Sequence, residues 1–344
     1  MATIGSGYGT SLFVDVNDRL WISGLDVFNS QSCTSPSMVE GVPPIQSVSC
    51  FGCVLLLDVE GYVWQVQESG LNKLTDIPAI KSISAGNSHS LLLDVNGEVW
   101  GLGSNNLRQL GENVDDVVHL PTKIQNIPMQ SIHASYNHSL LLDVEGRVWG
   151  SGTNLNSRMG MKETPTAPTI IGIDTKIQSV SSGWVHSLFI DVNNNLLSCG
   201  ANHMFQQGLD EPKIEHVKKH SKLPEVRLAN GGQYHSMFVD MNDSVWVCGG
   251  NLTGLLGTAC NPNLPLQRAV LFDSIPPIVS ISSLDHSLYL DAEGNVWSCG
   301  KNDVGQLGLG FACEQVHIPT KIESIPCIKH PSSRPFRAKS ARNI

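Results

Sequence analysis

The chain has 344 residues, of which 41% are hydrophobic and 15% are charged, and this composition is typical of a folded globular protein. Its net charge of -9 at pH 7 disfavours general nucleic-acid binding by the body of the protein, because phosphate recognition needs Lys and Arg concentrated on one surface. No window approaches about 18 apolar residues, and the N-terminus has no signal-peptide pattern. We therefore expect an intracellular protein, cytoplasmic or nuclear, without membrane contact.

The first stretch, IGSGYGTS at residues 4–11, has the glycine content of a phosphate-binding loop. A P-loop needs a Lys directly before its last Ser or Thr, and a dinucleotide loop follows a strand and opens a helix. Neither condition holds, since the next residues, LFVDV, form a short apolar run that is typical of a strand. We interpret the stretch as a strand end and a turn, with no cofactor.

One pattern then recurs along the chain, and its clearest copies are HSLLLDVNGEVWGLG at 89–103 and HSLLLDVEGRVWGSG at 138–152. The apolar run predicts a buried strand, and the Asp-x-x-Gly that follows predicts the tight turn of a hairpin. The Asp at the end of each run marks seven copies, 36 to 51 residues apart: Asp15, Asp58, Asp94, Asp143, Asp191, Asp240 and Asp291.

Each copy also has a strand-like stretch upstream, as at 77–86, and a Gly-x-Asn-x-x-x-Gln-Leu-Gly stretch downstream, as at 103–111. Small antiparallel sheets that cannot bury their faces alone predict an all-β, seven-bladed β-propeller. SIPCIK at 324–329 matches the start of a repeat that TIGSG at 3–7 continues, so we expect the two terminal segments to pair in one blade and close the ring. We expect one propeller over 1–329 and a basic, disordered tail over 330–344; whether the short second repeat makes a full blade stays open.

The pattern Ser-Ile-Ser-Ala-Gly-x-x-His-Ser-Leu-Leu-Leu-Asp, followed by Gly-x-Val-Trp-x-x-Gly and Asn-x-x-x-Gln-Leu-Gly, resembles the repeat of the regulator of chromosome condensation family over about residues 2–329. The resemblance implies a seven-bladed propeller. Similar proteins include exchange factors for the small GTPase Ran, a plant ultraviolet sensor and propeller modules of larger signalling proteins. The wedge that the exchange factor inserts has no evident counterpart here, and only GWVHS at 183–187 approaches the photoreceptor's Gly-Trp-Arg-His-Thr motif.

The repeated polar residues favour structural roles. Equivalent positions of a propeller lie on a ring, too far apart to share an ion, so we expect backbone hydrogen bonds from His89, His138, His186, His235 and His286. We expect turn roles for the seven Asp residues, and packing for Trp64, Trp100, Trp149, Trp246, Trp297, Cys199, Cys248 and Cys299. A lone Cys50-x-x-Cys53 lacks the second pair of a zinc site. We expect no catalytic constellation, metal or cofactor.

Function should then reside where the repeats differ. Residues that break the template near exposed turns are candidate partner contacts: Arg108, Arg158, Trp184, His203 and Phe205. The first hypothesis is a non-enzymatic, monomeric propeller that binds another protein through one face of the ring. The second is a guanine-nucleotide exchange factor for a Ran-like or other small GTPase. A third, chromatin association through the basic tail SSRPFRAKSARNI at 332–344, is compatible with either.

Overall fold

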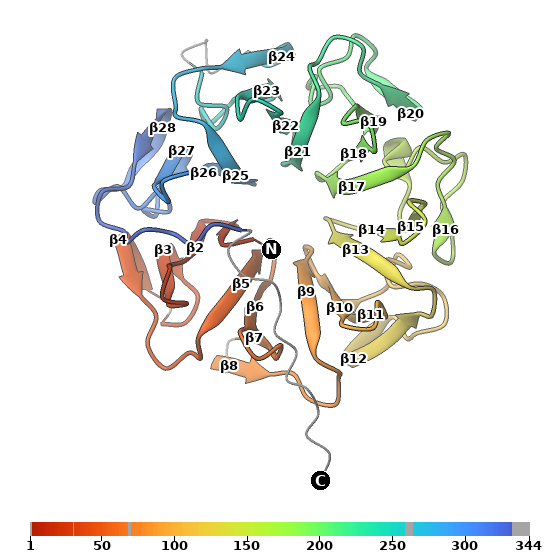
Figure 1. The fold of residues 1–344 in the computed structure, drawn as a ribbon, viewed down its shortest axis with the longest axis horizontal. Coiled ribbons are helices and arrows are strands. Elements are labelled where there is room, and N and C mark those ends of the chain that lie inside the picture. The colour runs from red at the N-terminus through yellow and green to blue at the C-terminus, as the bar shows by residue number, and fades with distance from the viewer. Residues whose placement is uncertain (1, 30, 68–69, 259–263, 332–344) are drawn as a thin grey trace.

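The strands form a closed ring of blades. The computed structural model describes residues 2–29, 31–67, 70–258 and 264–331, and within these ranges seven four-stranded antiparallel sheets surround one axis (Figure 1). The innermost strand of blade 1, β1 (Ile4–Ser6), contacts both β5 (Ile45–Cys50) and β25 (Ile278–Ser283), which closes the ring. The predicted all-β, seven-bladed propeller is confirmed. The described residues include no helix long and apolar enough to cross a bilayer.

Each blade is a run of four strands from the axis outward. Blade 1 holds β1, β2 (Thr10–Val14), β3 (Leu20–Asp26) and β4 (Gln31–Met38). Blade 2 holds β5, β6 (Val54–Asp58), β7 (Val63–Gln67) and β8 (Gly70–Lys73). Blade 3 holds β9 (Ile80–Ala85), β10 (His89–Asp94), β11 (Val99–Ser104) and β12 (Val117–Gln125). Blade 2 is therefore complete, although its repeat is short.

The remaining blades follow the same order. Blade 4 holds β13 (Met129–Ala134), β14 (His138–Asp143), β15 (Val148–Gly152), a 3-10 turn (Leu155–Ser157) and β16 (Thr169–Ile170). Blade 5 holds β17 (Ile177–Ser182), β18 (His186–Asp191), β19 (Leu196–Ala201) and β20 (Lys213–Lys219). Blade 6 holds β21 (Val226–Gly231), β22 (His235–Asp240), β23 (Val245–Gly249) and β24 (Leu266–Phe272). Blade 7 holds β25, β26 (His286–Asp291), β27 (Val296–Asn302) and β28 (Cys313–Lys321).

The repeated Asp holds two elements of its blade together. Asp94 Oδ1 accepts the backbone N–H of Asn96 at 2.8 Å and of Glu98 at 2.9 Å, which closes the turn after β10. Its Oδ2 accepts the indole N–H of Trp100 at 3.2 Å, so the same carboxylate fixes the first bulky side chain of the return strand. The equivalent indole donates to the equivalent Asp at Trp21, Trp64, Trp149, Trp246 and Trp297. The sequence predicted the turn but not the bond to Trp.

The apolar core is divided among the spaces between neighbouring blades. Between blades 4 and 5, for example, Leu140 and Leu142 of β14 pack with Phe189 of β18, and all three are buried. A single blade therefore exposes apolar surface on both sides, and it depends on its two neighbours for burial.

Both ends of the described chain contribute to the inner strand of blade 1. Ile328 forms an antiparallel bridge with Asp15, and the Lys329 N–H donates to the Val14 carbonyl at 3.0 Å. The ammonium of Lys329 lies 2.5 Å from Asp18 Oδ1, in an ion pair whose side chains are 9% and 13% exposed. The predicted disordered tail lies outside the described residues from residue 332 onward.

Candidate functional site

The antiparallel order of each blade gives the ring two chemically different faces. The turns from first to second strand and the connections from third to fourth strand lie at the end where β10 begins with His89. We call this end the His face. The Asp turns between second and third strands lie at the opposite end, which we call the Asp face.

The repeated His residues join neighbouring blades through side chains, and not through the backbone groups expected from sequence. His89 Nε2 in blade 3 lies 2.9 Å from Ser139 Oγ in blade 4, and this hydroxyl donates to the Gln109 carbonyl of blade 3 at 2.8 Å. The same His-to-Ser contact, at 2.6 to 3.2 Å, joins His138 to Ser187, His186 to Ser236 and His286 to Ser11. His235 instead contacts Ser283 of the inner strand β25 at 2.6 Å, and Ser283 in turn lies 2.8 Å from Ser287, the serine at the equivalent position. At the equivalent place in blade 2, Cys53 Sγ contacts Ser90 Oγ at 3.2 Å.

The hydrogen-bond pattern fixes the tautomer of three of these rings, those of His89, His138 and His186. The Ser139 hydroxyl donates its proton to the Gln109 carbonyl, so in its contact with His89 it can only accept. Nε2 of His89 must therefore carry a proton and donate it to Ser139 Oγ. Nδ1 is then left as an acceptor, and it has no partner at His89, His138 or His186. Burial lowers the pKa of His89 and His186 to about 3, so the rings are neutral at physiological pH.

One of these contacts resembles a hydrolase triad in its connectivity. Ser11 Oγ lies 2.6 Å from His286 Nε2, and His286 Nδ1 lies 2.6 Å from Asp285 Oδ1. However, Ser11 donates its proton to the Gln306 carbonyl at 2.7 Å, and both Ser11 and His286 are fully buried. This arrangement is the His-to-Ser contact of blades 7 and 1 with one added carboxylate, and the buried hydroxyl is not placed to attack a substrate.

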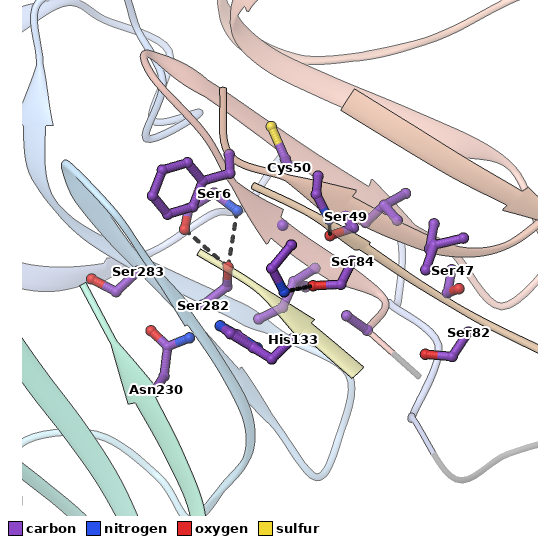
Figure 2. Close-up of a pocket in the computed structure, with 18 of the residues that line it drawn as sticks. Ser6, Ser47, Ser49, Cys50, Ser82, Ser84, His133, Asn230, Ser282 and Ser283 are labelled. Carbon is purple, nitrogen blue, oxygen red and sulfur yellow. Dashed lines mark hydrogen bonds between the residues drawn. The ribbon is translucent and has the colours of Figure 1, made fainter. Parts of the chain in front are cut away.

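Serine hydroxyls join neighbouring inner strands around the central channel. The channel contains a cavity of about 220 Å³ lined by inner strands, and the described residues that line it include no Asp, Glu, Lys or Arg. Figure 2 shows Ser84 and Ser282 bonded to the neighbouring strand; their Oγ atoms accept the Ala134 and Ser6 N–H groups at 2.8 and 2.9 Å. His133 takes the place of such a serine in blade 4, and burial lowers its pKa to about 4. The channel is thus a neutral hub that joins the blades.

An aromatic cluster covers the axis on the His face. Trp184 is its centre: Tyr136 stacks on it with ring centroids 4.7 Å apart, and Tyr234 and Tyr8 approach its ring at 5.7 and 6.3 Å. Tyr8 also contacts Phe51 at 6.0 Å. These residues come from the first turns of blades 1, 2, 4, 5 and 6, and because blades 1 and 5 are not neighbours, the contact of Tyr8 with Trp184 crosses the axis. Tyr8 and Tyr234 are each 37% exposed.

Local backbone geometry positions Trp184. The preceding Gly183 has no side chain, and a Cβ there would clash with the carbonyl of Gly232 in blade 6. The Trp184 N–H instead donates to that carbonyl at 3.2 Å, and Arg158 Nη1 donates to the Trp184 carbonyl at 3.0 Å. The turn that carries the central ring is therefore tied to two neighbouring segments.

The five sequence-predicted contact residues have different environments. Trp184 and His203 belong to the aromatic region, with the His203 ring 5.6 Å from that of Tyr234. Arg158 is 5% exposed, its guanidinium donates to the Trp184 carbonyl, and burial lowers its pKa to about 10. Arg108 pairs with Asp116 at 3.0 Å on the surface, and Phe205 is half-buried in a turn with positive φ.

Four residues of the cluster were not predicted from the sequence: Tyr8, Phe51, Tyr136 and Tyr234. They occupy the turn between the first strand and the His position, where the repeats vary. Alignment of these turns shows an aromatic residue in five of the seven copies, which is the signal that could have located the cluster.

The fold and its repeated contacts define a seven-bladed β-propeller. A family model described as regulator of chromosome condensation (RCC1) repeat matches residues 96–142 and 293–333, and a second model with this description matches residues 80–109 and 279–306. The match at 96–142 runs from β11 of blade 3 to β14 of blade 4. These segments of the propeller are therefore similar to RCC1 repeats.

Solved structures share this fold at low sequence identity. Yeast RCC1 (Prp20) bound to Kap60 has a TM-score of 0.78 and 20% identity over 87% of this chain and 80% of that chain. Prp20p from Saccharomyces cerevisiae, described with its binding to Gsp1p and histones, has a TM-score of 0.77 and 20% identity over 86% and 81%. Human WBSCR16 has a TM-score of 0.75 and 20% identity over 84% of each chain. No curated protein sequence matches the chain. These identities show a common fold alone.

Proposed function

We propose that this protein is a non-enzymatic recognition module that binds another protein through its His face. The observation that carries the proposal is the aromatic cluster, in which rings from blades 1, 4 and 6 contact Trp184 of blade 5 while Tyr8 and Tyr234 remain 37% exposed. Tyr and Trp are enriched at the centres of protein interfaces, because a rigid ring buries a large area at a low cost in conformational entropy.

The other face lacks such a concentration. Its exposed apolar side chains, such as Val144 and Val192, follow the repeated Asp and are spread around the ring, as are the half-buried Trp residues that donate to that Asp. The ring pairs nearest this face among the described residues, His220 with Phe238 and Phe272 with Tyr289, are buried. The repeated His, Ser and Asp residues are engaged in bonds that hold the blades, so they support a scaffold and not a reaction.

The experiment is affinity capture from source-cell lysate with three full-length baits: the natural chain, a Trp184→Ala/Tyr234→Ala double variant and Tyr62→Ala. Tyr62 is a matched control, since it is a 45% exposed aromatic residue at an Asp turn. We expect partner recovery to fall about tenfold with the double variant and to be unchanged with Tyr62→Ala. Equal recovery with all three folded baits would contradict binding through the His face.

A second candidate is guanine-nucleotide exchange on a small GTPase. It rests on the RCC1 repeats and on the fold shared with Prp20p, for which binding to Gsp1p and histones has been described. The same capture performed in EDTA and then challenged with magnesium and excess GDP separates the candidates, because an exchange factor and a nucleotide weaken each other's binding. A GTPase retained in EDTA and released by nucleotide supports exchange, whereas partners indifferent to nucleotide support recognition alone.

A further inference from the structure

The electrostatic surroundings of the aromatic cluster are negative. The described first turns and outer connections of the His face contain more carboxylates, namely Glu112, Asp115, Asp116, Glu163, Asp210, Glu211, Asp285 and Asp303, than cations, namely Arg108, Arg158 and Lys162. Lys218, Arg268 and Lys301 on the flanking strands pair with three of these carboxylates, and the excess of negative charge persists.

One carboxylate abuts the cluster itself. Asp285 Oδ2 accepts the Gly9 N–H at 3.1 Å, directly beside Tyr8, while its Oδ1 contacts His286 Nδ1 and 13% of the side chain stays exposed. Burial is the main cause that raises the pKa of Tyr8 to about 12, and the nearby Tyr136 and Asp285 add to it. The phenol is therefore neutral at physiological pH, and its ring keeps the negative face that attracts cations.

The cation–π contacts within the protein lie on other aromatic residues, outside this cluster. In the described part of the chain, Lys73 sits over the rings of Tyr62 and Trp64, and Arg19 lies 5.8 Å from the ring centroid of Trp21. No such contact is found on a ring of the cluster within the described ranges. Among the described residues, the largest group of touching aromatic rings thus lies beside a carboxylate and has no cation over a ring face; the one cation bonded to it, Arg158, lies buried behind the Trp184 turn, where its Nη1 donates to the Trp184 carbonyl.

We propose that the cluster receives a Lys or Arg side chain from a basic segment of the partner protein, an inference that rests on the proposed function. The cation lies against the rings of Trp184, Tyr8 and Tyr234, and Asp285 supplies the opposite charge at the edge. An apolar side chain would remove water from Asp285 without providing a countercharge, and an acidic one would be repelled. A basic side chain makes a cation–π contact with the ring faces and also provides a positive charge beside the carboxylate.

The test measures fluorescence anisotropy of short labelled peptides with the full-length protein at physiological salt. The peptides share a Gly/Ser frame and carry Arg, Lys, acetyl-lysine, norleucine or Glu at the variable positions. We expect the Arg and Lys peptides to bind about tenfold more tightly than the other three. Norleucine binding as tightly as Lys would overturn the proposal, as would the absence of Arg and Lys binding up to about 1 mM peptide.

Variants of the protein distinguish peptide binding at the aromatic cluster from nonspecific attraction to the acidic loops. Trp184→Ala should weaken binding of the Arg and Lys peptides about tenfold. Tyr234→Leu should weaken their binding severalfold, and it leaves the central ring of Trp184 in place. Tyr62→Ala should leave affinity within about twofold. Undiminished binding by both folded cluster variants would assign the affinity to the acidic loops alone and overturn the proposal.

The two proposals fail in different ways. If basic peptides do not bind but capture of a partner still depends on Trp184 and Tyr234, the choice of a basic partner is wrong and recognition through the His face stands. If capture is independent of these rings, recognition through this face is wrong, whatever the peptides do.

Discussion

His186 Nε2 lies 2.8 Å from Ser236 Oγ, and this hydroxyl donates its own proton to the Gln206 carbonyl at 2.6 Å. The chain of bonds runs from blade 5 to blade 6 and back to blade 5, with both side chains buried. Because similar contacts recur around the ring, they fix the relative positions of blades that share no backbone bonds within a sheet. The aromatic cluster, whose rings come from five blades, relies on this fixed geometry.

Removal of one such hydroxyl should destabilise the fold. Ser236→Ala leaves the buried N–H of His186 without its acceptor and leaves the Gln206 carbonyl with the Cys248 thiol alone as donor, so we expect the free energy of unfolding to fall by about 1–3 kcal/mol. Urea denaturation at neutral pH measures this change. Ser37→Ala, at an exposed position in β4, is the control and should stay within about 0.5 kcal/mol; an equally small effect at Ser236 would contradict the role of the bond.

The neutral His rings predict a loss of stability in mild acid. Burial lowers the pKa of His186 to about 3, whereas the side chain titrates near 6.5 in an unfolded chain. The unfolded state therefore binds a proton that the folded state does not, so stability is complete above about pH 6.5 and falls as the pH drops toward 3.

For His186 alone this loss is about 1.4 kcal/mol between about pH 7.5 and pH 5.5. His186→Gln retains an N–H donor but cannot titrate, so its free energy of unfolding should change by about 1.4 kcal/mol less than that of the natural chain over the same interval. Denaturant titrations at the two pH values provide the comparison. An identical pH dependence in the two proteins would rule out His186 as a contributor.

Ring closure should depend on the C-terminal segment that pairs with blade 1. Ile328 is 1% exposed, and Ile328→Ala removes buried methyl groups at the closing position, so we expect a loss of about 2–5 kcal/mol. Ile318→Ala, at a 59% exposed position in β28, should have little effect. Deletion of residues 1–9 removes all of β1 and should lower the melting temperature sharply. An unchanged melting temperature in the deletion would show that β1 is dispensable for closure.

The sequence was sufficient to predict the fold because every repeat carries its own local signals. Asp94 illustrates this: the buried run before it and the Gly after it specify a strand and a turn without reference to any other repeat. The partner of a repeated His was not predictable in this way. Ser139, which bonds to His89, lies in the next blade, and only the radial arrangement of the sheets brings the two side chains together.

The candidate site was predicted only in part. Trp184 and His203 were named because they break the repeat, but Tyr8 was not, although its ring meets Trp184 across the axis. Closure of the ring places these distant turns together, and that proximity has no counterpart in the spacing of residues along the chain. Arg158 was named as a candidate partner contact because it also breaks the repeat, and its guanidinium is buried and donates to the backbone carbonyls of Leu155 and Trp184.

The most direct measurement is amide hydrogen exchange of the full-length protein with and without its captured partner. Recognition through the His face predicts slower exchange in the turns at 7–9, 135–137, 183–185 and 232–234, where the aromatic residues lie. The Asp turns, such as 144–147 and 192–195, should exchange at the same rate in both states. Protection confined to the Asp turns or to the outer strands would contradict the account.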